Sequence, residues 1–360
     1  KHEPFMLMEQ TPSQQNWQKY NSLKRPGQMR AQSYQTMAHG ADTIQFFQLR
    51  RSVGACEKFH GAVIAHAGTE NTRVFREVAQ LGKELESFGT KTLGSENLSD
   101  VGLIFDWENY WALEYTSGPS EDLKYVEQIH KYYNYFYERN ISVDMIPVDA
   151  DFSQYKMVVA PVLYMVKEGI LITTYMSGIV DQSDNVHLGG YPGPLRDMAG
   201  VWVEEIDALA PEQVNEVKFT DGTTASCNLL CDLLHLEGAK ALATYQKDFY
   251  ADMPAVTRNT FGKGATYYVG TQMDDAGLAK ILDQAVNEVN VRAVIPEVTG
   301  LEVTCRTSDD TRYYYVMNFK DEDQVLPDSL GGKTDLISGE VIPAGTVLKK
   351  WDVLILQEEK

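Results

Sequence analysis

The stretch PFMLME at residues 4–9 decides how the amino-terminal part of the chain folds. Its apolar run predicts a short buried strand that ends in a carboxylate. After a polar loop, the sequence predicts a helix over 28–38 and a second apolar strand, TIQFFQL, at 43–49. Thr72 can cap a further helix over 73–87. Because buried strands alternate with helices, we expect the two strands to pair in parallel.

The same kind of pattern starts again after the polar linker LGSENLSD at 93–100. Short apolar runs alternate with longer segments of helical periodicity, which predicts an open α/β sheet of flavodoxin-like character. The predicted strands are 101–105, 142–146, 157–163, 170–175, 225–234, 241–245 and 265–269, and the predicted helices are 121–139 and 278–289.

One junction in this second segment is too short to connect the two predicted strands on either side of it in parallel. Only about six residues separate the predicted strands 157–163 and 170–175, whereas a parallel crossover needs roughly a dozen or more. Either the two strands are antiparallel or a connecting helix is missing, and we favour the missing helix.

From about residue 296 the pattern changes to short strands separated by turn residues, which predicts a small all-β domain. The predicted strands are 301–306, 312–319, 334–336, 340–342 and 352–357. The chain is thus expected to contain three domains, at 1–92, 93–295 and 296–360.

The composition excludes several classes of protein. The 360 residues carry 32 basic and 51 acidic side chains, a formal net charge of −19, which would repel nucleic acid and anionic membranes. Four cysteines suit a reducing compartment better than a disulfide scaffold. No apolar run reaches the ~20 residues that span a bilayer. We therefore expect a soluble, cytoplasmic protein.

Glu9 is the first candidate for chemistry, because a carboxylate at the end of a buried strand is a common catalytic position in α/β barrels. The polar loop that follows surrounds one aromatic residue, Trp17. A Trp face packs on the C–H face of a pyranose while amides and hydroxyls bind its OH groups, so the loop suggests a carbohydrate subsite. The alternatives are a salt-bridged strand-end Glu9 and a core role for Trp17.

Glu57 and His60 lie in the loop after the second strand, and Phe47 lies near its end. If the two strands are neighbours in a barrel, this loop shares a rim with Glu9. A carboxylate and an imidazole there could bind sugar hydroxyls. The alternatives are a surface ion pair of Glu57 and a capping role for His60.

Several long motifs occur in the order found in a known family. They are MEQTPS at 8–13, NW at 16–17, RPG at 25–27, AHGAD at 38–42, FFQ at 46–48, EKFHGA at 57–62, TRVFRE at 72–77, YPGPLR at 191–196 and WVEE at 202–205. With them the chain resembles the β-galactosidases of glycoside hydrolase family 42 over nearly its whole length.

This resemblance implies an α/β fold. Residues 1–92 would form the last two βα units of a (β/α)8 barrel, followed by an amidotransferase-like α/β domain that builds a trimer and a small C-terminal β domain. Glu9 would be the nucleophile, and Trp17, Phe47, Glu57 and His60 would bind galactose. The first six barrel strands and the acid/base Glu are absent, as is the cysteine cluster that binds zinc in some members.

The expected function is hydrolysis of terminal β-D-galactose from small β-galactosides by double displacement, in a homotrimer. Two alternatives stay open at this point: a non-catalytic trimerising fragment that needs a partner chain, and an α-L-arabinopyranosidase, whose substrate shares the hydroxyl pattern of galactose. The amidotransferase-like segment lacks a G-x-C-x-G elbow and therefore a nucleophile of its own.

Cys227, Cys231 and His235 are spaced by four residues, which would align them on a helix as soft metal ligands. No fourth ligand follows at zinc spacing, and the leucines between them are typical of a core. We therefore expect no metal and no cofactor in this chain.

Overall fold

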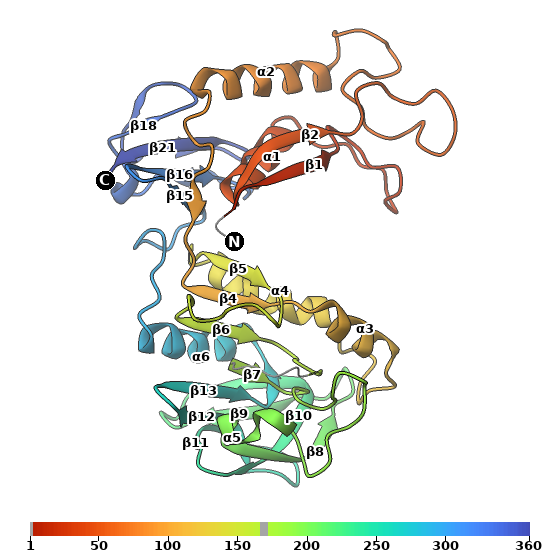
Figure 1. Ribbon diagram of the computed structural model, residues 1–360, viewed down its shortest axis with the longest axis vertical. Helices are drawn as coiled ribbons and strands as arrows, with labels where there is room; N and C mark the ends of the chain where they lie inside the picture. The colour runs from red at the N-terminus through yellow and green to blue at the C-terminus, as the bar shows by residue number, and fades with distance from the viewer. Residues whose placement is uncertain (1–2, 166–171) are drawn as a thin grey trace. The chain divides into compact units, whose positions relative to one another are not determined.

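The computed structural model describes residues 3–165 and 172–360. It is a mixed α/β structure with several sheets (Figure 1). Its contacts form two units. Unit 1 contains Lys1–Leu98, Tyr137–Ser142 and Ala293–Lys360, and unit 2 contains Ser99–Phe136 and Val143–Arg292. No helix of the described residues is long and apolar enough to cross a bilayer.

The amino-terminal part of unit 1 has the predicted order of elements. Strand β1 (Phe5–Gln10), helix α1 (Gln28–Ala38), strand β2 (Ala41–Phe46) and helix α2 (Arg73–Phe88) follow one another. The two strands pair in parallel, with Phe5 opposite Ala41 and Gln10 opposite Phe46, which confirms the prediction. The hydroxyl of Thr72 accepts a hydrogen bond from the Phe75 N–H at 3.3 Å and caps α2, as expected.

The carboxyl-terminal part of unit 1 is built of short strands, as predicted. Six strands form one sheet in the order β19-β18-β21-β16-β15-β3, and two further strands pair separately. The bounds are β3 (Glu96–Asn97), β15 (Glu302–Thr307), β16 (Thr311–Met317), β17 (Gln324–Val325), β18 (Lys333–Asp335), β19 (Val341–Ile342), β20 (Val347–Leu348) and β21 (Val353–Glu359).

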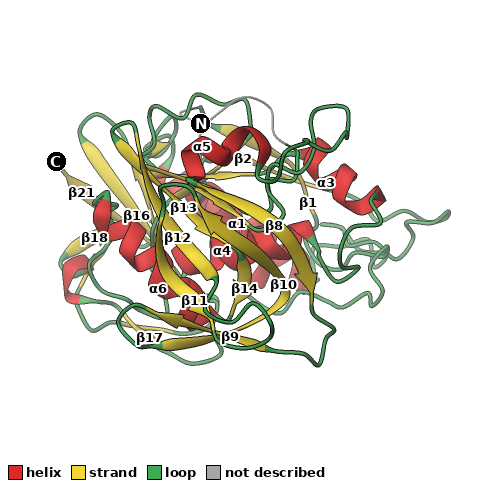
Figure 2. Ribbon diagram, turned by 90° about the horizontal axis from the view of Figure 1, so that it is seen from below, coloured by secondary structure: helices red, strands yellow, loops and turns green. Residues whose placement is uncertain are grey.

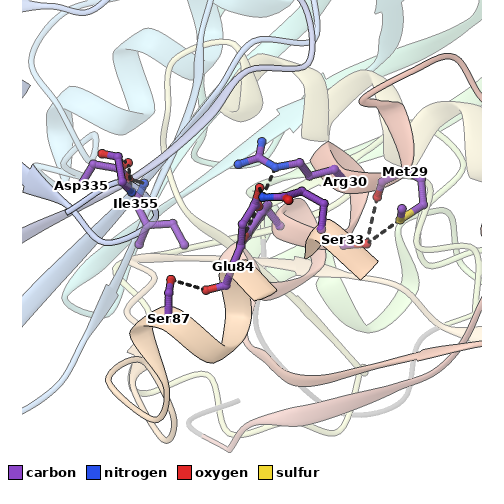
Figure 3. Close-up of polar contacts among 10 residues, drawn as sticks. Met29, Arg30, Ser33, Glu84, Ser87, Asp335 and Ile355 are labelled. Atoms are coloured by element: carbon purple, nitrogen blue, oxygen red, sulfur yellow. Dashed lines mark hydrogen bonds and ion pairs between the residues drawn. The ribbon is translucent and has the colours of Figure 1, made fainter. Parts of the chain in front are cut away.

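Both parts of unit 1 contribute to one hydrophobic core. Met29 and Tyr34 of α1 are fully buried in the same cluster as Tyr315 of β16 and Ile355 of β21. Polar contacts fix α1 against α2 at the edge of this core. Glu84 of α2 accepts hydrogen bonds from the Arg30 guanidinium at 2.7 Å and the Tyr34 hydroxyl at 3.0 Å, and Figure 3 shows Arg30 reaching Glu84.

A buried arginine also joins the two parts of unit 1. Arg306 of β15 has no exposed side-chain surface. Its guanidinium donates to the carbonyl oxygens of Met37 and Ala41 at 3.1 and 3.0 Å and to the Asp42 carboxylate at 2.6 Å. It also donates to the Ser95 carbonyl. The end of α1 and the start of β2 are therefore held by the carboxyl-terminal sheet.

Unit 2 contains one eleven-stranded sheet, in the order β14-β10-β9-β11-β12-β13-β7-β6-β4-β5 with β8 paired to β10. Figure 2 shows β8 running beside the long strand β10. The strands are β4 (Val101–Ile104), β5 (Val143–Ile146), β6 (Met157–Ala160), β7 (Ile172–Thr174), β8 (Val201–Ala208), β9 (Asn215–Phe219), β10 (Thr224–Leu236), β11 (Lys240–Tyr245), β12 (Pro254–Phe261), β13 (Gly264–Val269) and β14 (Thr271–Met273). The helices are α3 (Trp107–Tyr115), α4 (Tyr125–Tyr137), α5 (Arg196–Ala199) and α6 (Asp275–Glu288).

Several expectations for unit 2 need correction. Strands β6 and β7 are parallel, with Ala160 opposite Thr173, so the antiparallel alternative is wrong. The missing helix was expected in a junction whose residues 166–171 lie outside the described part of the chain. The predicted helix 121–139 is shorter in the structure, and α3, α5, β8, β9, β12 and β14 were not predicted.

Candidate active site

Strands β1 and β2, after which the predicted site residues follow, end side by side. Gln10, the last residue of β1, is opposite Phe46 of β2, and the Phe47 N–H donates to the Gln10 carbonyl at 3.0 Å. Glu9 is exposed and directly precedes Gln10. The Gln10 amide oxygen accepts from the Ser33 hydroxyl of α1 at 3.1 Å, so the side chain next to Glu9 is hydrogen-bonded to this helix. Glu9 and Phe47 therefore lie at adjacent carboxyl ends of parallel strands, the usual place for sites in α/β folds.

The loops that follow the two strands are hydrogen-bonded to each other. The Asn16 amide donates to the Cys56 carbonyl at 2.5 Å, and the Asn21 amide donates to the Phe59 carbonyl at 3.1 Å. The Gly61 N–H donates to the Gln14 carbonyl at 2.8 Å. A Cβ at Gly61 would lie only 2.9 Å from that same oxygen, so the close approach requires glycine. The two loops therefore form one polar layer over the strand ends.

His60 is the most buried of the predicted site residues, with 3% of its surface exposed. Its ring meets the Phe47 ring edge to face, with centroids 5.3 Å apart and an interplanar angle of 76°. Nδ1 lies 2.9 Å from the Gly61 carbonyl oxygen. Because a carbonyl only accepts, Nδ1 carries the proton of the neutral ring and Nε2 is left as the acceptor.

The other predicted residues are more open. Glu57 is half-buried, and its carbonyl accepts from the His60 N–H at 2.9 Å, which sets the turn that carries both residues. Trp17 is 67% exposed, so it has no core role within the described residues. The structure thus brings Phe47, Glu57 and His60 together on one loop system and leaves the Trp17 ring free for contact with another group.

Lys24 is part of this cluster and was not predicted. Its ammonium group donates to the Thr11 carbonyl at 2.7 Å, two residues after Glu9, and its own carbonyl accepts from Arg73 at 3.0 Å. Burial lowers the pKa of Lys24 to about 8. No sequence signal distinguished it from other lysines, because its position depends on how the loop folds back.

Some buried polar atoms of the two loops have no partner among the described residues. They are Ser13 Oγ, Gln14 Oε1, Gln48 Nε2 and Arg51 Nε. Because buried polar groups in folded proteins are almost always hydrogen-bonded, these atoms call for partners from outside the described chain.

The predicted strand 225–234 is confirmed as part of β10, so the helical alignment that would make Cys227, Cys231 and His235 metal ligands does not form. These residues lie on strand β10, where Leu229 between them has a positive φ of 68°. The Cys227 and Cys231 thiols remain in hydrogen-bonding contact with each other, whereas His235 lies apart from them against the Glu204 carboxylate at 2.6 Å. Within residues 3–165 and 172–360, no three His, Cys, Asp or Glu side chains gather as a metal site requires.

The fold and the site together define a mixed α/β protein with a polar cluster at the carboxyl ends of two parallel strands. Three family models cover almost all of the chain: β-galactosidase at residues 1–88, β-galactosidase trimerisation domain at 99–292 and β-galactosidase C-terminal domain at 300–358. The chain belongs to this β-galactosidase family, glycoside hydrolase family 42.

Individual relatives agree with the family models. The chain is 48% identical to β-galactosidase LacZ of Lactobacillus acidophilus, over 99% of the chain and 55% of the relative. It is 50% identical to β-galactosidase BgaA of a Planococcus species, over 98% and 55%. The crystal structure of β-galactosidase from Bacillus circulans sp. alkalophilus matches with a TM-score of 0.94 and 47% identity, over 99% of this chain and 55% of that one. The chain therefore spans about half the length of the relatives it matches.

Proposed function

We propose that this chain is part of a retaining β-galactosidase that releases terminal β-D-galactose from small β-galactosides. The proposal rests above all on one observation: a segment that matches the β-galactosidase family model carries an exposed carboxylate, Glu9, at the end of a parallel strand. A relative of 37% identity has been solved as a catalytic mutant in which alanine replaces a glutamate.

We propose that β1 and β2, with α1 and α2, are the last two βα units of a (β/α)8 barrel. Strand β1 has large exposed apolar side chains, Phe5, Met6 and Met8, and pairs on one side only among the described residues. An exposed apolar edge favours further strands beside it. The unpartnered polar atoms of the adjoining loops favour the same conclusion. The proposed domains are 1–92, 93–295 and 296–360.

In the proposed mechanism the Glu9 carboxylate attacks the anomeric carbon, and the bond to the leaving oxygen breaks. A second carboxylic acid, about 5–5.5 Å away in retaining enzymes, gives its proton to that oxygen. The same group then takes a proton from water, which attacks the galactosyl–Glu9 ester and releases galactose with net retention. This chain supplies the attacking group, and the proton donor would come from the remainder of the barrel.

The other side chains would bind the sugar. Trp17 offers an exposed aromatic face for the C–H groups of the pyranose. Glu57 would accept hydrogen bonds from galactose hydroxyls, and Nε2 of His60 would accept one more, with Phe47 fixing the ring plane of His60. No cofactor is assigned to any residue of this chain. We propose a homotrimer in the cytoplasm, with no nucleic-acid or membrane partner.

The experiment is done on the full-length protein. Glu9→Gln should lower kcat for an aryl β-D-galactoside by several orders of magnitude, while Glu3→Gln, an exposed carboxylate just before the same strand, should leave it unchanged. In Glu9→Ala, azide should restore turnover and give the α-galactosyl azide, because the anion enters from the face that the nucleophile has vacated. A β-galactosyl azide, or full activity of Glu9→Gln, would show that Glu9 is not the nucleophile. Comparing the rates on the aryl β-D-galactoside and the aryl α-L-arabinopyranoside tests the alternative that the enzyme is an α-L-arabinopyranosidase.

A further inference from the structure

Strand β10 has a break that brings two cysteines close together in unit 2. In a regular strand, residues four positions apart are separated by about 13 Å. Cys227 of β10 lies opposite Met273 of β14, and Cys231 lies opposite Thr271, so four steps along β10 match only two steps along β14. The extra residues fall around Leu229, where φ is 68°. The break therefore shortens the path between the two cysteines.

The register also places both thiols on one side of the sheet. Alternate residues of a strand face the same side and lie about 6.4–6.8 Å apart, so we expect a similar separation between the Cα atoms of Cys227 and Cys231, which lie opposite such residues. Disulfide-linked cysteines have Cα atoms roughly 4.4–6.8 Å apart. The two thiols are in hydrogen-bonding contact and are 1% and 0% exposed. The contact is thus held inside unit 2.

The surroundings of the two thiols differ. Cys231 Sγ lies 3.5 Å from the Thr271 hydroxyl oxygen. The hydrogen bond from Cys227, helped by one from Thr271, lowers the pKa of Cys231 in spite of its burial. The same bond and burial raise the pKa of Cys227. Because the thiolate is the nucleophile in thiol–disulfide exchange, Cys231 is the attacking sulfur and Cys227 is the one that follows.

We propose that Cys227 and Cys231 form a redox-sensitive site at which a disulfide is made reversibly by exchange with a disulfide of the glutathione class. The Cys231 thiolate attacks one sulfur of oxidised glutathione, whose S–S bond breaks, and one glutathione leaves as a thiolate. Cys227 then loses its proton and attacks the Cys231 sulfur, which releases the second glutathione. The chain gives up two electrons, and its two thiol protons end on the two reduced glutathione molecules.

The buried pair is reached through a short edge strand. β14 contains three residues and, among the described residues, is the last strand of its sheet and pairs with β10 alone. Local opening costs least where few contacts are broken, so we expect the release of β14 to expose both sulfurs. On its other side β10 pairs with β9 as far as Cys227 and with β8 from Leu230 onward. The disulfide would therefore fix the corner at which β10 changes partner.

The test measures the equilibrium of bond formation, because the rate depends on opening. The full-length protein is incubated with mixtures of reduced and oxidised glutathione, both folded and in concentrated urea. The remaining thiols are trapped with N-ethylmaleimide, and mass spectrometry of the peptides gives the fraction that carries the Cys227–Cys231 bond. The effective concentration of the pair should be roughly 30-fold higher in the folded protein, because the folded chain already holds closed a loop of five residues that the unfolded chain must close.

Two variants locate the bond. Cys227→Ser should abolish the internal disulfide and leave at most a mixed disulfide with glutathione at Cys231. Cys305→Ser, which removes a thiol of unit 1, is the matched control and should leave the effective concentration unchanged. Protein that has first been oxidised with diamide should reach the same fractions in the same mixtures, which shows that equilibrium has been attained.

The alternative outcomes count against the proposal. An effective concentration no higher in the folded protein than in urea would show that the folded contact does not favour the bond. A disulfide of either cysteine with Cys56 or Cys305 would overturn the pairing. By linkage, the oxidised protein should also have an unfolding constant lower by the same factor of roughly 30 in a urea titration, and a larger unfolding constant would show that the bond strains the fold. None of these results depends on the role of Glu9.

Discussion

Asp232 is expected to make the stability of unit 2 fall as the pH rises. It lies on β10 with no exposed surface. One carboxylate oxygen accepts from the Tyr268 hydroxyl at 2.7 Å, and the other, Oδ1, has no partner among the described residues. Burial therefore raises the pKa of Asp232 from 3.8 to about 7. The substitution that tests this is Asp232→Asn, which keeps an oxygen to accept from Tyr268 and cannot ionise.

The magnitude follows from the two pKa values. Because the folded state holds the proton more tightly than the unfolded state, stability is unaffected below about pH 4 and is lost progressively up to about pH 7. The difference of about 3 units corresponds to about 4 kcal/mol at pH 7 and above, and to about 2 kcal/mol at pH 5. Asp232→Asn should therefore gain stability relative to the unmodified chain by roughly 2 kcal/mol between pH 5 and pH 7.

The assay is urea unfolding followed by circular dichroism at several pH values from 4 to 8. The quantity compared is the difference in unfolding free energy between Asp232→Asn and the unmodified chain. Asp149→Asn, an exposed carboxylate in the same unit, serves as the control and should give a difference that does not change with pH. A difference for Asp232→Asn that is equally independent of pH would show that burial does not hold the carboxyl protonated.

Three further outcomes are expected. Arg306→Met should lower the unfolding free energy by about 3–5 kcal/mol in urea unfolding, since it removes the buried guanidinium that donates to Asp42 and to three carbonyls. Removal of the half-exposed guanidinium in Arg312→Met should cost about 1 kcal/mol or less. Thr72→Ala should cost about 1 kcal/mol through loss of the α2 cap, and Thr72→Ser should restore it; equal stability of all three would show that the cap contributes nothing. Lys24 should titrate near pH 8 when NMR follows its labelled ε-methylene group, and a midpoint above pH 10 would show that it is not buried.

The sequence was most informative where local chemistry marks the ends of elements. Helix α1 begins and ends at the predicted residues because Pro26-Gly27 precedes it and Gly40, with a φ of 107°, follows it. The parallel pairing of β1 and β2 was predicted from their apolar sequences and their alternation with helices and is confirmed, although the predicted burial of β1 is not found among the described residues. From that pairing alone, Glu9 and Phe47 could be expected at neighbouring strand ends, which is where they lie.

The features that the sequence did not give depend on contacts between distant residues. Helix α3 escaped prediction because its aromatic residues face outward, so the usual apolar periodicity of a surface helix is inverted. The strand at 225–234 was predicted, but the break in β10 at Leu229, where φ is 68°, was not. Lys24 belongs to the site only because its side chain folds back to the Thr11 carbonyl.

Unit 1 explains how two strands can hold a site without a complete sheet. A two-stranded sheet alone is marginal in water. Here α1 buries Met29 and Tyr34 in the same core as Tyr315 of the carboxyl-terminal sheet. Arg306 then fixes the start of β2 from that sheet, about 260 residues further along the chain. Arg306 acts at the amino end of β2, the core packs along β2 as far as Phe46, and Glu9 near the carboxyl end of β1 stays exposed and open to a ligand.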